Sequence, residues 1–204
     1  MGLTQTEKRK GGRGRVPIQM NRQRILWITQ TAVFIALLVT AQIFTFPYGQ
    51  FVTGSSVNFI LVMACILLGL PAAATVGVLS PLIAFMITGR PIFPQLIPFV
   101  MIGNVALVVA VYFIFSKSYV EPWRFSYIRA AMAVIIGAVL KFVVLWVGVV
   151  QVALSFIPNI LPQQVANLSH AFSWPQLVTA LIGGTLAMVV APYLAQAVRG
   201  FGSR

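Results

Sequence analysis

One lysine, Lys141, lies near the middle of an apolar run, 129–151, that is rich in valine, leucine and alanine. A helix needs about 20 apolar residues to cross a bilayer, and a charge at its centre costs roughly 2.5–3.5 kcal/mol on insertion scales. The two acidic residues, Glu7 and Glu121, lie in a basic N-terminal tail and in a polar connector. Neither can reach mid-membrane, so the lysine must meet backbone oxygen, a neutral polar side chain, water or an anionic ligand.

Lys141 shares a helix face with small and polar residues. The neighbours that project to this face, at about 100° per residue, are Gly137, Val144, Gly148 and Gln151. We expect this face to look into the protein. Asn104 lies about 9–12 Å inside the preceding apolar run by helix rise, so the two polar side chains could line one cavity. The structural alternatives are a lysine held by helix carbonyls and an asparagine that only hydrogen-bonds between helices.

Other chemistries find little support in the sequence. One histidine, one cysteine and two distant acids do not assemble a usual metal site. A hydrolytic serine needs an activating histidine, and the pair Ser80 and His170 lacks a Gly-x-Ser-x-Gly context. The sequence has no phosphate-cradling glycine loop, so ATP, if it drives this protein, is hydrolysed by another subunit. We therefore expect a binding protein without a cofactor rather than an enzyme.

Composition places the chain among integral membrane proteins, with 59% hydrophobic residues, 8% charged residues and a mean hydropathy of +0.95. We expect an all-α membrane protein that folds as one compact bundle. The net charge of +12 and the glycine-arginine tract at 11–15 would suit nucleic acid. Basic residues beside a first membrane span explain them better, because they hold the N-terminus in the cytoplasm and touch anionic lipid.

Six transmembrane spans are predicted. Residues 1–24 are interpreted as a disordered basic cytoplasmic tail, 25–198 as the membrane domain and 199–204 as a second cytoplasmic tail. The predicted spans are 25–44, 57–70, 73–88, 96–115, 127–155 and 174–198. Proline and glycine predict a tight turn at 69–71 and a further break at 80–81. The basic start and apolar middle of the first span also resemble a cleaved signal peptide, but five later apolar stretches favour an uncleaved span.

Basic residues predict the orientation. The N-terminal tail, the 116–129 connector and the C-terminus hold nearly all Lys and Arg, which places both chain ends in the cytoplasm. Three loops, 45–56, 89–95 and 156–173, then lie outside. The candidate ligand-binding residues are Lys141, Asn104 and Gln151 on the spans, together with Tyr48, Phe51, Arg90, Asn167, His170 and Trp174 in or beside these loops.

Three segments carry a family resemblance: 32–36 with an alanine at each end, the broken region 68–81, and 97–104 ending in Asn104. With the size, six spans and basic N-terminus, they resemble the S component, the substrate-binding membrane subunit of energy-coupling factor (ECF) vitamin transporters. The resemblance implies a prokaryotic cell-membrane location and a helix face with Ala32 and Ala36 that meets a transmembrane coupling subunit. That subunit would connect to two cytoplasmic ATPases, and the S component would topple to release its vitamin inward.

From these residues we expect capture of a small, scarce, anionic micronutrient. Lys141 would supply charge and Asn104 a hydrogen bond, while Tyr48 and Phe51 close over the ligand. Pantothenate, niacin, biotin or lipoate suit an unpaired ammonium better than cationic thiamine, and the sequence has no signature that chooses among them. Two alternatives stay open. A stand-alone transporter or channel would usually show broken helices in both halves, and a membrane scaffold needs no buried lysine.

Overall fold

A computed structural model describes residues 22–116 and 127–202, with side chains at 24–116 and 127–194. The predicted N-terminal tail therefore lies almost entirely outside the described residues, as do Glu7 and Glu121. In the described ranges the chain is helical and has no strand. The α-helices are α1 (Arg22–Thr45), α2 (Gln50–Leu68), α3 (Leu70–Thr88), α4 (Ile97–Ser116), α5 (Tyr127–Leu145), α6 (Pro162–Ala171) and α7 (Trp174–Gly202).

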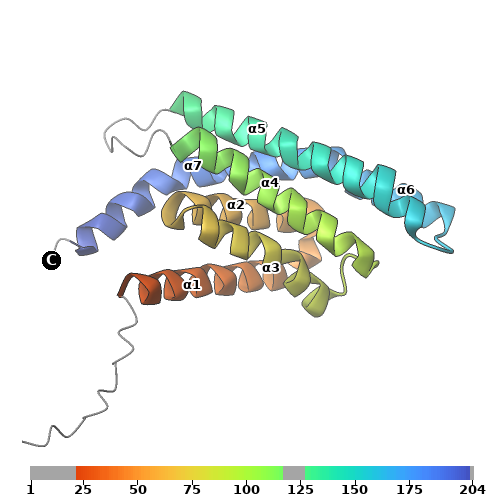
Figure 1. Cartoon of the computed structure of the whole chain (residues 1–204), viewed down its shortest axis with the longest axis horizontal. Coiled ribbons are helices and arrows are strands. Elements are labelled where there is room, and N and C mark those ends of the chain that lie inside the picture. The colour runs from red at the N-terminus through yellow and green to blue at the C-terminus, as the bar shows by residue number, and fades with distance from the viewer. Residues whose placement is uncertain (1–21, 117–126, 203–204) are drawn as a thin grey trace, which may run out of the picture.

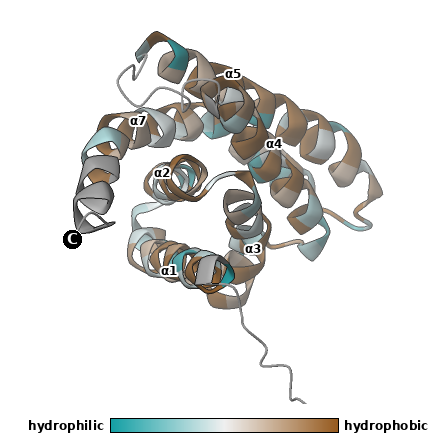
Figure 2. Ribbon diagram, turned by 60° about the vertical axis from the view of Figure 1, so that its left-hand side comes forward, coloured by the Kyte–Doolittle hydropathy of each residue, from teal (hydrophilic) through white to brown (hydrophobic). Residues whose placement is uncertain are grey.

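The helices form one elongated bundle (Figure 1). Six of the described helical segments are long and apolar enough to cross a membrane. Large apolar side chains also cover much of the outer surface, as at Met86, which is 84% exposed, and the ribbon is mostly hydrophobic (Figure 2). Such a surface suits lipid rather than water. The structure thus confirms the prediction of an all-α membrane bundle.

The centre of the bundle is α2, which Figure 2 shows surrounded by the other long helices. Every residue from Ile60 to Ile66 is buried. The second half of α2 packs against Leu107, Val108 and Val111 of α4 and against Ala187 of α7 in one apolar core. That core fills the half of the bundle nearer the chain ends.

The start of α2 differs from the sequence prediction, which placed a loop at 45–56. α2 begins at Gln50 rather than at 57, after a short 3-10 turn (Phe46–Tyr48) and Gly49. The polar residues that suggested a loop are accommodated in the helix, because Thr53 Oγ1 donates to the Gly49 carbonyl and Ser56 Oγ to the Val52 carbonyl. These local bonds satisfy the hydroxyl groups without water.

The turn at 69–71 is confirmed, and the further break at 80–81 is not. Gly69 has a φ of +88°, which a residue with a side chain rarely adopts, and it separates α2 from α3. Pro81, in contrast, lies inside a continuous α3. Membrane helices tolerate such a proline where a neighbouring group pairs with the carbonyl that it leaves free.

The long loop predicted at 156–173 contains structure of its own. After α5 the chain continues as a π-helical segment (Trp146–Val152) and a 3-10 turn (Ala153–Phe156), and then forms α6. No residue of α6 is buried. Figure 1 shows α6 at the end of the bundle opposite the start of α1 and the end of α7. This end also carries the α3–α4 connection, so the three predicted outer loops gather at one end.

Candidate functional site

A cavity of about 520 Å³ lies at this end of the bundle. Residues from all seven α-helices line it, together with the connections that follow α1 and α3. Its walls are mainly apolar, including Val57, Pro81, Ala84, Val100 and Phe172. The polar side chains that line it are Gln42, Gln50, Thr53, Asn58, Ser80, Thr88, Arg90, Asn104, Lys141, Gln164, Asn167 and Gln176. Apolar walls with a few polar groups are typical of small-molecule sites.

Lys141 is 3% exposed, and its ammonium contacts two amide oxygens. Nζ donates to Asn58 Oδ1 at 2.6 Å and to Asn104 Oδ1 at 2.7 Å. These partners are side-chain amides rather than the helix carbonyls of the structural alternative. An ammonium has three N–H donors, and the third has no partner among the described residues. Both partners are neutral, so the charge of Lys141 is solvated but not neutralised.

Asn104 is held in this orientation by α3. Its Nδ2 donates to the Gly77 carbonyl at 3.1 Å. In an α-helix that carbonyl would pair with the N–H of residue 81, but Pro81 has no N–H. The proline therefore frees the carbonyl that fixes Asn104. Gly77 allows the close approach, since a Cβ there would lie 3.3 Å from the Cβ of Asn104.

Asn58 is held in a similar way by α7. Its Nδ2 donates to Thr179 Oγ1 at 3.3 Å, and the threonine hydroxyl donates to the Gln176 carbonyl at 3.2 Å. α2 and α7 approach closely here, because a Cβ on Gly183 would lie 2.3 Å from the Ser55 carbonyl oxygen. Each asparagine thus directs its N–H₂ group away from the lysine, which leaves both oxygens facing the ammonium.

A second polar pair lines the cavity from α1 and α3. Gln42 Nε2 donates to the Ser80 carbonyl at 3.1 Å and lies 3.2 Å from Ser80 Oγ. Gln42 and Ser80 are each 3% exposed. The remaining amide oxygen, Gln42 Oε1, has no hydrogen-bond partner among the described residues.

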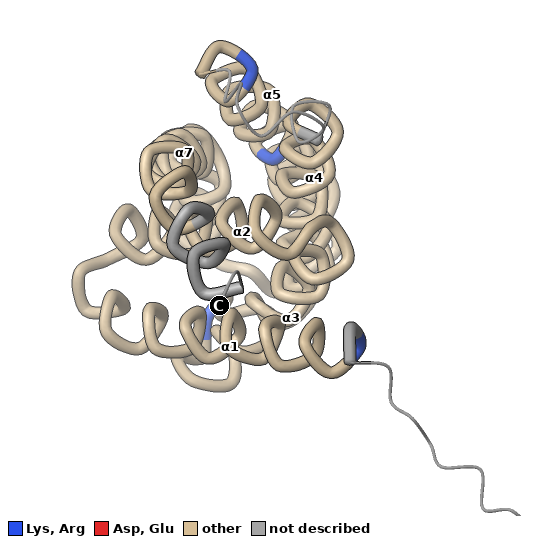
Figure 3. Tube along the Cα trace, turned by 90° about the vertical axis from the view of Figure 1, so that its left-hand side faces the viewer, with Lys and Arg blue, Asp and Glu red and all other residues tan. Residues whose placement is uncertain are grey.

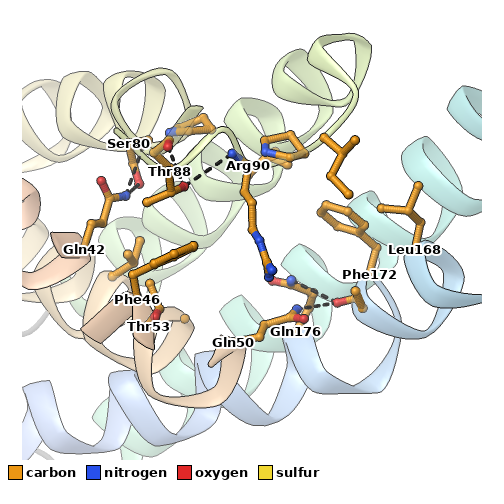
Figure 4. Close-up of a pocket in the computed structure, with 18 of the residues that line it drawn as sticks. Gln42, Phe46, Gln50, Thr53, Ser80, Thr88, Arg90, Leu168, Phe172 and Gln176 are labelled. Carbon is orange, nitrogen blue, oxygen red and sulfur yellow. Dashed lines mark hydrogen bonds between the residues drawn. The ribbon is translucent and has the colours of Figure 1, made fainter. Parts of the chain in front are cut away.

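Arg90 reaches over the mouth of the cavity. Its guanidinium carbon lies 5.3 Å from the centroid of the Phe46 ring, within cation–π range. Figure 4 shows the Arg90 side chain extended toward Gln50 and Gln176. These two glutamines both donate to the Ala171 carbonyl, at 2.6 and 3.2 Å, which attaches the end of α6 to α2 and α7.

The structure brings four of the sequence-predicted residues to the cavity: Lys141, Asn104, Arg90 and Asn167. Three others form an aromatic group outside its lining. Phe51 and His170 both contact the Trp174 ring, with centroid distances of 5.5 and 5.6 Å. Tyr48 is 74% exposed and does not line the cavity either. Ligand contacts of all these residues stay predictions.

Gln151 differs most from its predicted position. Gly137 and Lys141 are buried as their shared helix face predicts, but Gln151 is exposed. The cause is the π-helical segment, which begins at Trp146. A π-helix has more residues per turn than an α-helix, so extrapolation at 3.6 residues per turn no longer gives the direction of the side chain.

Sequence reasoning missed Asn58, the second partner of Lys141, and the hydrogen-bonded pair of Gln42 and Ser80. Asn58 and Gln42 each carried a usable signal, an amide side chain among apolar residues of a predicted membrane helix. Ser80 was considered only as a nucleophile. Nothing in the spacing indicated that Thr179 would contact Asn58, since they are far apart in the chain and belong to different helices.

The charged side chains that line the cavity are all positive. Lys141 and Arg90 line it, and no described residue is acidic, because both glutamates lie outside the described ranges (Figure 3). The described residues also contain no group of three or more metal-ligating side chains. The arrangement therefore provides positive charge, hydrogen-bonding groups and apolar surface, which together can bind a small anion-bearing molecule.

A comparison with protein families assigns the chain to one of them. Residues 27–195 match the family described as the ECF transporter substrate-specific component. No curated protein and no solved structure matches the chain. Members of this family are substrate-binding subunits of transporters rather than enzymes, and they are multi-pass plasma-membrane proteins. Since the match covers most of the sequence, it confirms the resemblance, and the chain belongs to the family of ECF transporter substrate-specific components.

Proposed function

We propose that this chain captures a small anionic micronutrient, vitamin or related, for uptake, with Lys141 as the charge that binds the anion. One observation carries the proposal: the Lys141 ammonium is buried against a cavity and contacts only neutral oxygens. A charge at this depth costs roughly 2.5–3.5 kcal/mol on insertion scales, and a bound carboxylate or phosphate would offset that cost.

The size and position of the cavity support this function. A volume of about 520 Å³ lies within the range of small-molecule sites and suits a molecule as large as a vitamin. The cavity is lined by α6 and by the connections that follow α1 and α3, which lie at the end of the bundle opposite the start of α1 and the end of α7 (Figure 1). With both chain ends in the cytoplasm, as the basic residues predict, it faces outside, where a scarce nutrient is captured.

Asn104 takes a different part in this proposal from the one predicted. Both of its polar groups are engaged, Oδ1 by Lys141 and Nδ2 by the Gly77 carbonyl. Asn104 and Asn58 therefore position the ammonium. The free third N–H of Lys141 is the donor left for the anion.

The Lys141→Met variant tests the proposal, because methionine keeps the length of the side chain and removes the charge. Purified protein is incubated with a deproteinised extract of soluble cell metabolites, and the retained compounds are identified by mass spectrometry. We expect the wild-type protein to retain an anionic compound and Lys141→Met to retain at least about tenfold less, since one charged hydrogen bond is worth about 1.5–3 kcal/mol. Arg24→Gln, which removes a charge at the opposite end of the bundle, serves as the control.

A second measurement needs no natural ligand. Ala84→Cys places a thiol on the cavity wall in a Cys65→Ser background, and its reaction rates with an anionic and a cationic thiosulfonate reagent are compared. Lys141→Met should lower the ratio of the anionic to the cationic rate, and Arg24→Gln should leave it unchanged. Equal retention and an unchanged rate ratio in Lys141→Met would rule out Lys141 as the anion-binding charge.

The proposal includes delivery inward by a transmembrane coupling subunit and two ATPases, the partnership that family membership implies. Ala32 and Ala36 are exposed on α1, with Thr29 and Thr40 on the same face, so this small-residue surface is free of other helices of the chain. Replacing both alanines by leucine should abolish co-purification of the coupling subunit and leave metabolite retention intact. Loss of retention in this double variant would instead indicate damage to the fold.

A further inference from the structure

One face of α2 meets α7 along a seam that runs from the end of α6 to the Lys141 network. On α2 the residues of the seam recur every four positions, so they share a helix face, and on α7 they are three or four positions apart. The members of this α2–α7 seam are Gln50, Gly54 and Asn58 of α2 and Gln176, Thr179 and Gly183 of α7. At its outer end the two glutamines share the Ala171 carbonyl, and Figure 4 shows them side by side.

Thr179 is the central α7 residue of the seam and packs directly on the backbone of α2. Its side chain is 1% exposed. A Cβ on Gly54 would lie 3.1 Å from Thr179 Cβ and 3.2 Å from Thr179 Oγ1, so a side chain at this position would push the threonine away from α2. The glycine thus allows the hydroxyl to reach Asn58, about one turn further along α2, at 3.3 Å.

The direction of the hydrogen bonds is set from the backbone of α7 through Thr179 to Asn58. The Gln176 carbonyl can only accept, so the Thr179 hydroxyl donates its one hydrogen there, at 3.2 Å. The hydroxyl oxygen is then left as an acceptor, and the Asn58 N–H₂ group donates to it. The Asn58 oxygen consequently faces the Lys141 ammonium, which has only donors, at 2.6 Å.

We infer that Thr179 is a positioning residue of the anion site, because its hydroxyl fixes the Asn58 amide that holds the Lys141 ammonium. The inference rests on the proposed function and deepens it by naming a residue that lies outside the cavity lining. Asn58 is 1% exposed, so without the hydroxyl its N–H₂ group would be buried without this acceptor. The amide would then rotate toward another acceptor, and its oxygen would leave Lys141 with Asn104 as the one remaining partner.

The test separates the hydroxyl of Thr179 from its shape. Thr179→Val removes the hydroxyl and keeps the branched side chain, whereas Thr179→Ser keeps the hydroxyl and removes the methyl group. Each purified protein is incubated with the same deproteinised extract of soluble cell metabolites, and the retained anionic compound is quantified by mass spectrometry. We expect Thr179→Val to retain about threefold to tenfold less than the wild-type protein and Thr179→Ser to stay within about twofold of it. Thr31→Val, which removes a buried hydroxyl outside the cavity lining, is the matched control.

Two further measurements distinguish positioning from a general effect on stability. In an Asn58→Leu background, Thr179→Val should cause no further loss of retention, because the amide that the hydroxyl fixes is absent. The second measurement needs no ligand. The chain has five asparagines, so isotopic labelling of asparagine nitrogen gives a simple magnetic resonance spectrum of side-chain amides, in which Asn58→Leu identifies the Asn58 signal. That signal should move in Thr179→Val and stay in place in Thr179→Ser and Thr31→Val.

The outcomes separate this inference from the proposed function. Wild-type retention in Thr179→Val, an Asn58 signal that does not move in that variant, or an equal loss in Thr179→Ser would each overturn the inference. A further loss in the Asn58→Leu background would also overturn it, since the threonine would then act other than through Asn58. All of these results leave an anion site that depends on Lys141 intact. If Lys141→Met retains as much as the wild-type protein, the proposed function itself fails, and this inference, which rests on it, fails too.

Discussion

The two ends of the bundle are joined by different chemistry. Near the chain ends, α2, α4, α5 and α7 meet through apolar side chains such as Leu61, Val111, Ala133 and Ala187. At the cavity end a smaller apolar cluster, which includes Leu145 and Val149, packs α5 against α4, but the four helices also meet there through the hydrogen bonds of Lys141, Asn58, Asn104 and Thr179. Apolar packing is non-directional, whereas these hydrogen bonds require specific partners. The first end can therefore supply stability while the second is organised around one charge.

This difference separates effects on folding from effects on binding. A change in the packed half should act on stability first, because close-packed interiors respond to single methyl groups. A change in the polar network should act on the position of the Lys141 ammonium and leave most of the core intact. The close crossing of α2 and α7 lies where the two regions meet, and we expect the largest effect there.

Gly183→Ala should damage both regions together. The new Cβ would lie 2.3 Å from the Ser55 carbonyl oxygen and 2.7 Å from the Phe59 nitrogen, which are backbone atoms of α2 and cannot rotate away. α2 must shift, and Asn58 moves with it. We expect destabilisation of about 3 kcal/mol or more, beyond the usual range for overpacking, and loss of ligand retention, measured by thermal unfolding in detergent and by metabolite mass spectrometry.

Gly184→Ala is the matched control for Gly183→Ala. A Cβ on Gly184 would meet Val134, with the nearest atom, Cγ1, at 2.7 Å. A side chain can change its rotamer, so this variant should lose less stability and should keep its ligand. Equal losses in the two variants would contradict the view that the α2–α7 crossing positions the site.

Pro81→Ala should separate stability from binding. The alanine restores an N–H that can pair with the Gly77 carbonyl, in competition with Asn104. Helix stability should rise or stay the same, because an interior proline costs about 3 kcal/mol. Ligand affinity should fall several-fold, by about 1 kcal/mol, as Asn104 loses its fixed orientation. Thermal unfolding and metabolite retention measure the two effects.

Pro192→Ala provides the comparison for this variant, since Pro192 also lies inside a helix, α7, but does not line the cavity. It should change stability without changing retention. If Pro81→Ala binds as tightly as the wild-type protein, the proline has no part in positioning Lys141, and the Gly77 carbonyl serves both donors at once.

The sequence was most informative where single residues dominate the free energy of placing the chain in a membrane. A lysine in a long apolar run, with both acids in polar segments, had to meet backbone oxygen, a neutral polar side chain, water or an anion, and Asn104, which was expected at the same cavity, is one of its two partners. Hydropathy located the spans because backbone groups in lipid must pair within a helix. Local hydrogen bonds such as that from Thr53 Oγ1 to the Gly49 carbonyl were harder to anticipate. The polar first turns of α2 therefore resembled a loop in the sequence.

What could not be predicted depends on contacts between distant segments. Asn58 and Lys141 belong to helices separated by two others in the chain, and a pattern within one helix does not specify its partner. The position of Gln151 required knowledge of a π-helical segment that no residue type in 146–152 indicates. The hydrogen bond from Gln42 to Ser80 could not be predicted either, because it depends on α1 and α3 being adjacent, which only the packing of the bundle determines.

Arg90→Gln should have the smallest effect, because Arg90 is exposed and its contact with Phe46 is worth about 0.5–1 kcal/mol. We expect the affinity for an anionic ligand to fall about twofold to fivefold, mainly through slower association. Exposed charges are screened by salt, whereas buried ones are screened much less. The association rate of the wild-type protein should therefore fall as ionic strength rises, and that of Arg90→Gln should fall less steeply.

Stopped-flow binding at several ionic strengths measures this difference, with Arg24→Gln at the opposite end of the bundle as the control. Measuring Lys141→Met in the same experiment separates the roles of the two cations. If Arg90 steers the anion and Lys141 holds it, Arg90→Gln changes the association rate and Lys141→Met the dissociation rate. An Arg90→Gln variant with faster dissociation and an unchanged association rate would mean that Arg90 contacts the bound anion directly, so that both ends of the cavity carry charge recognition.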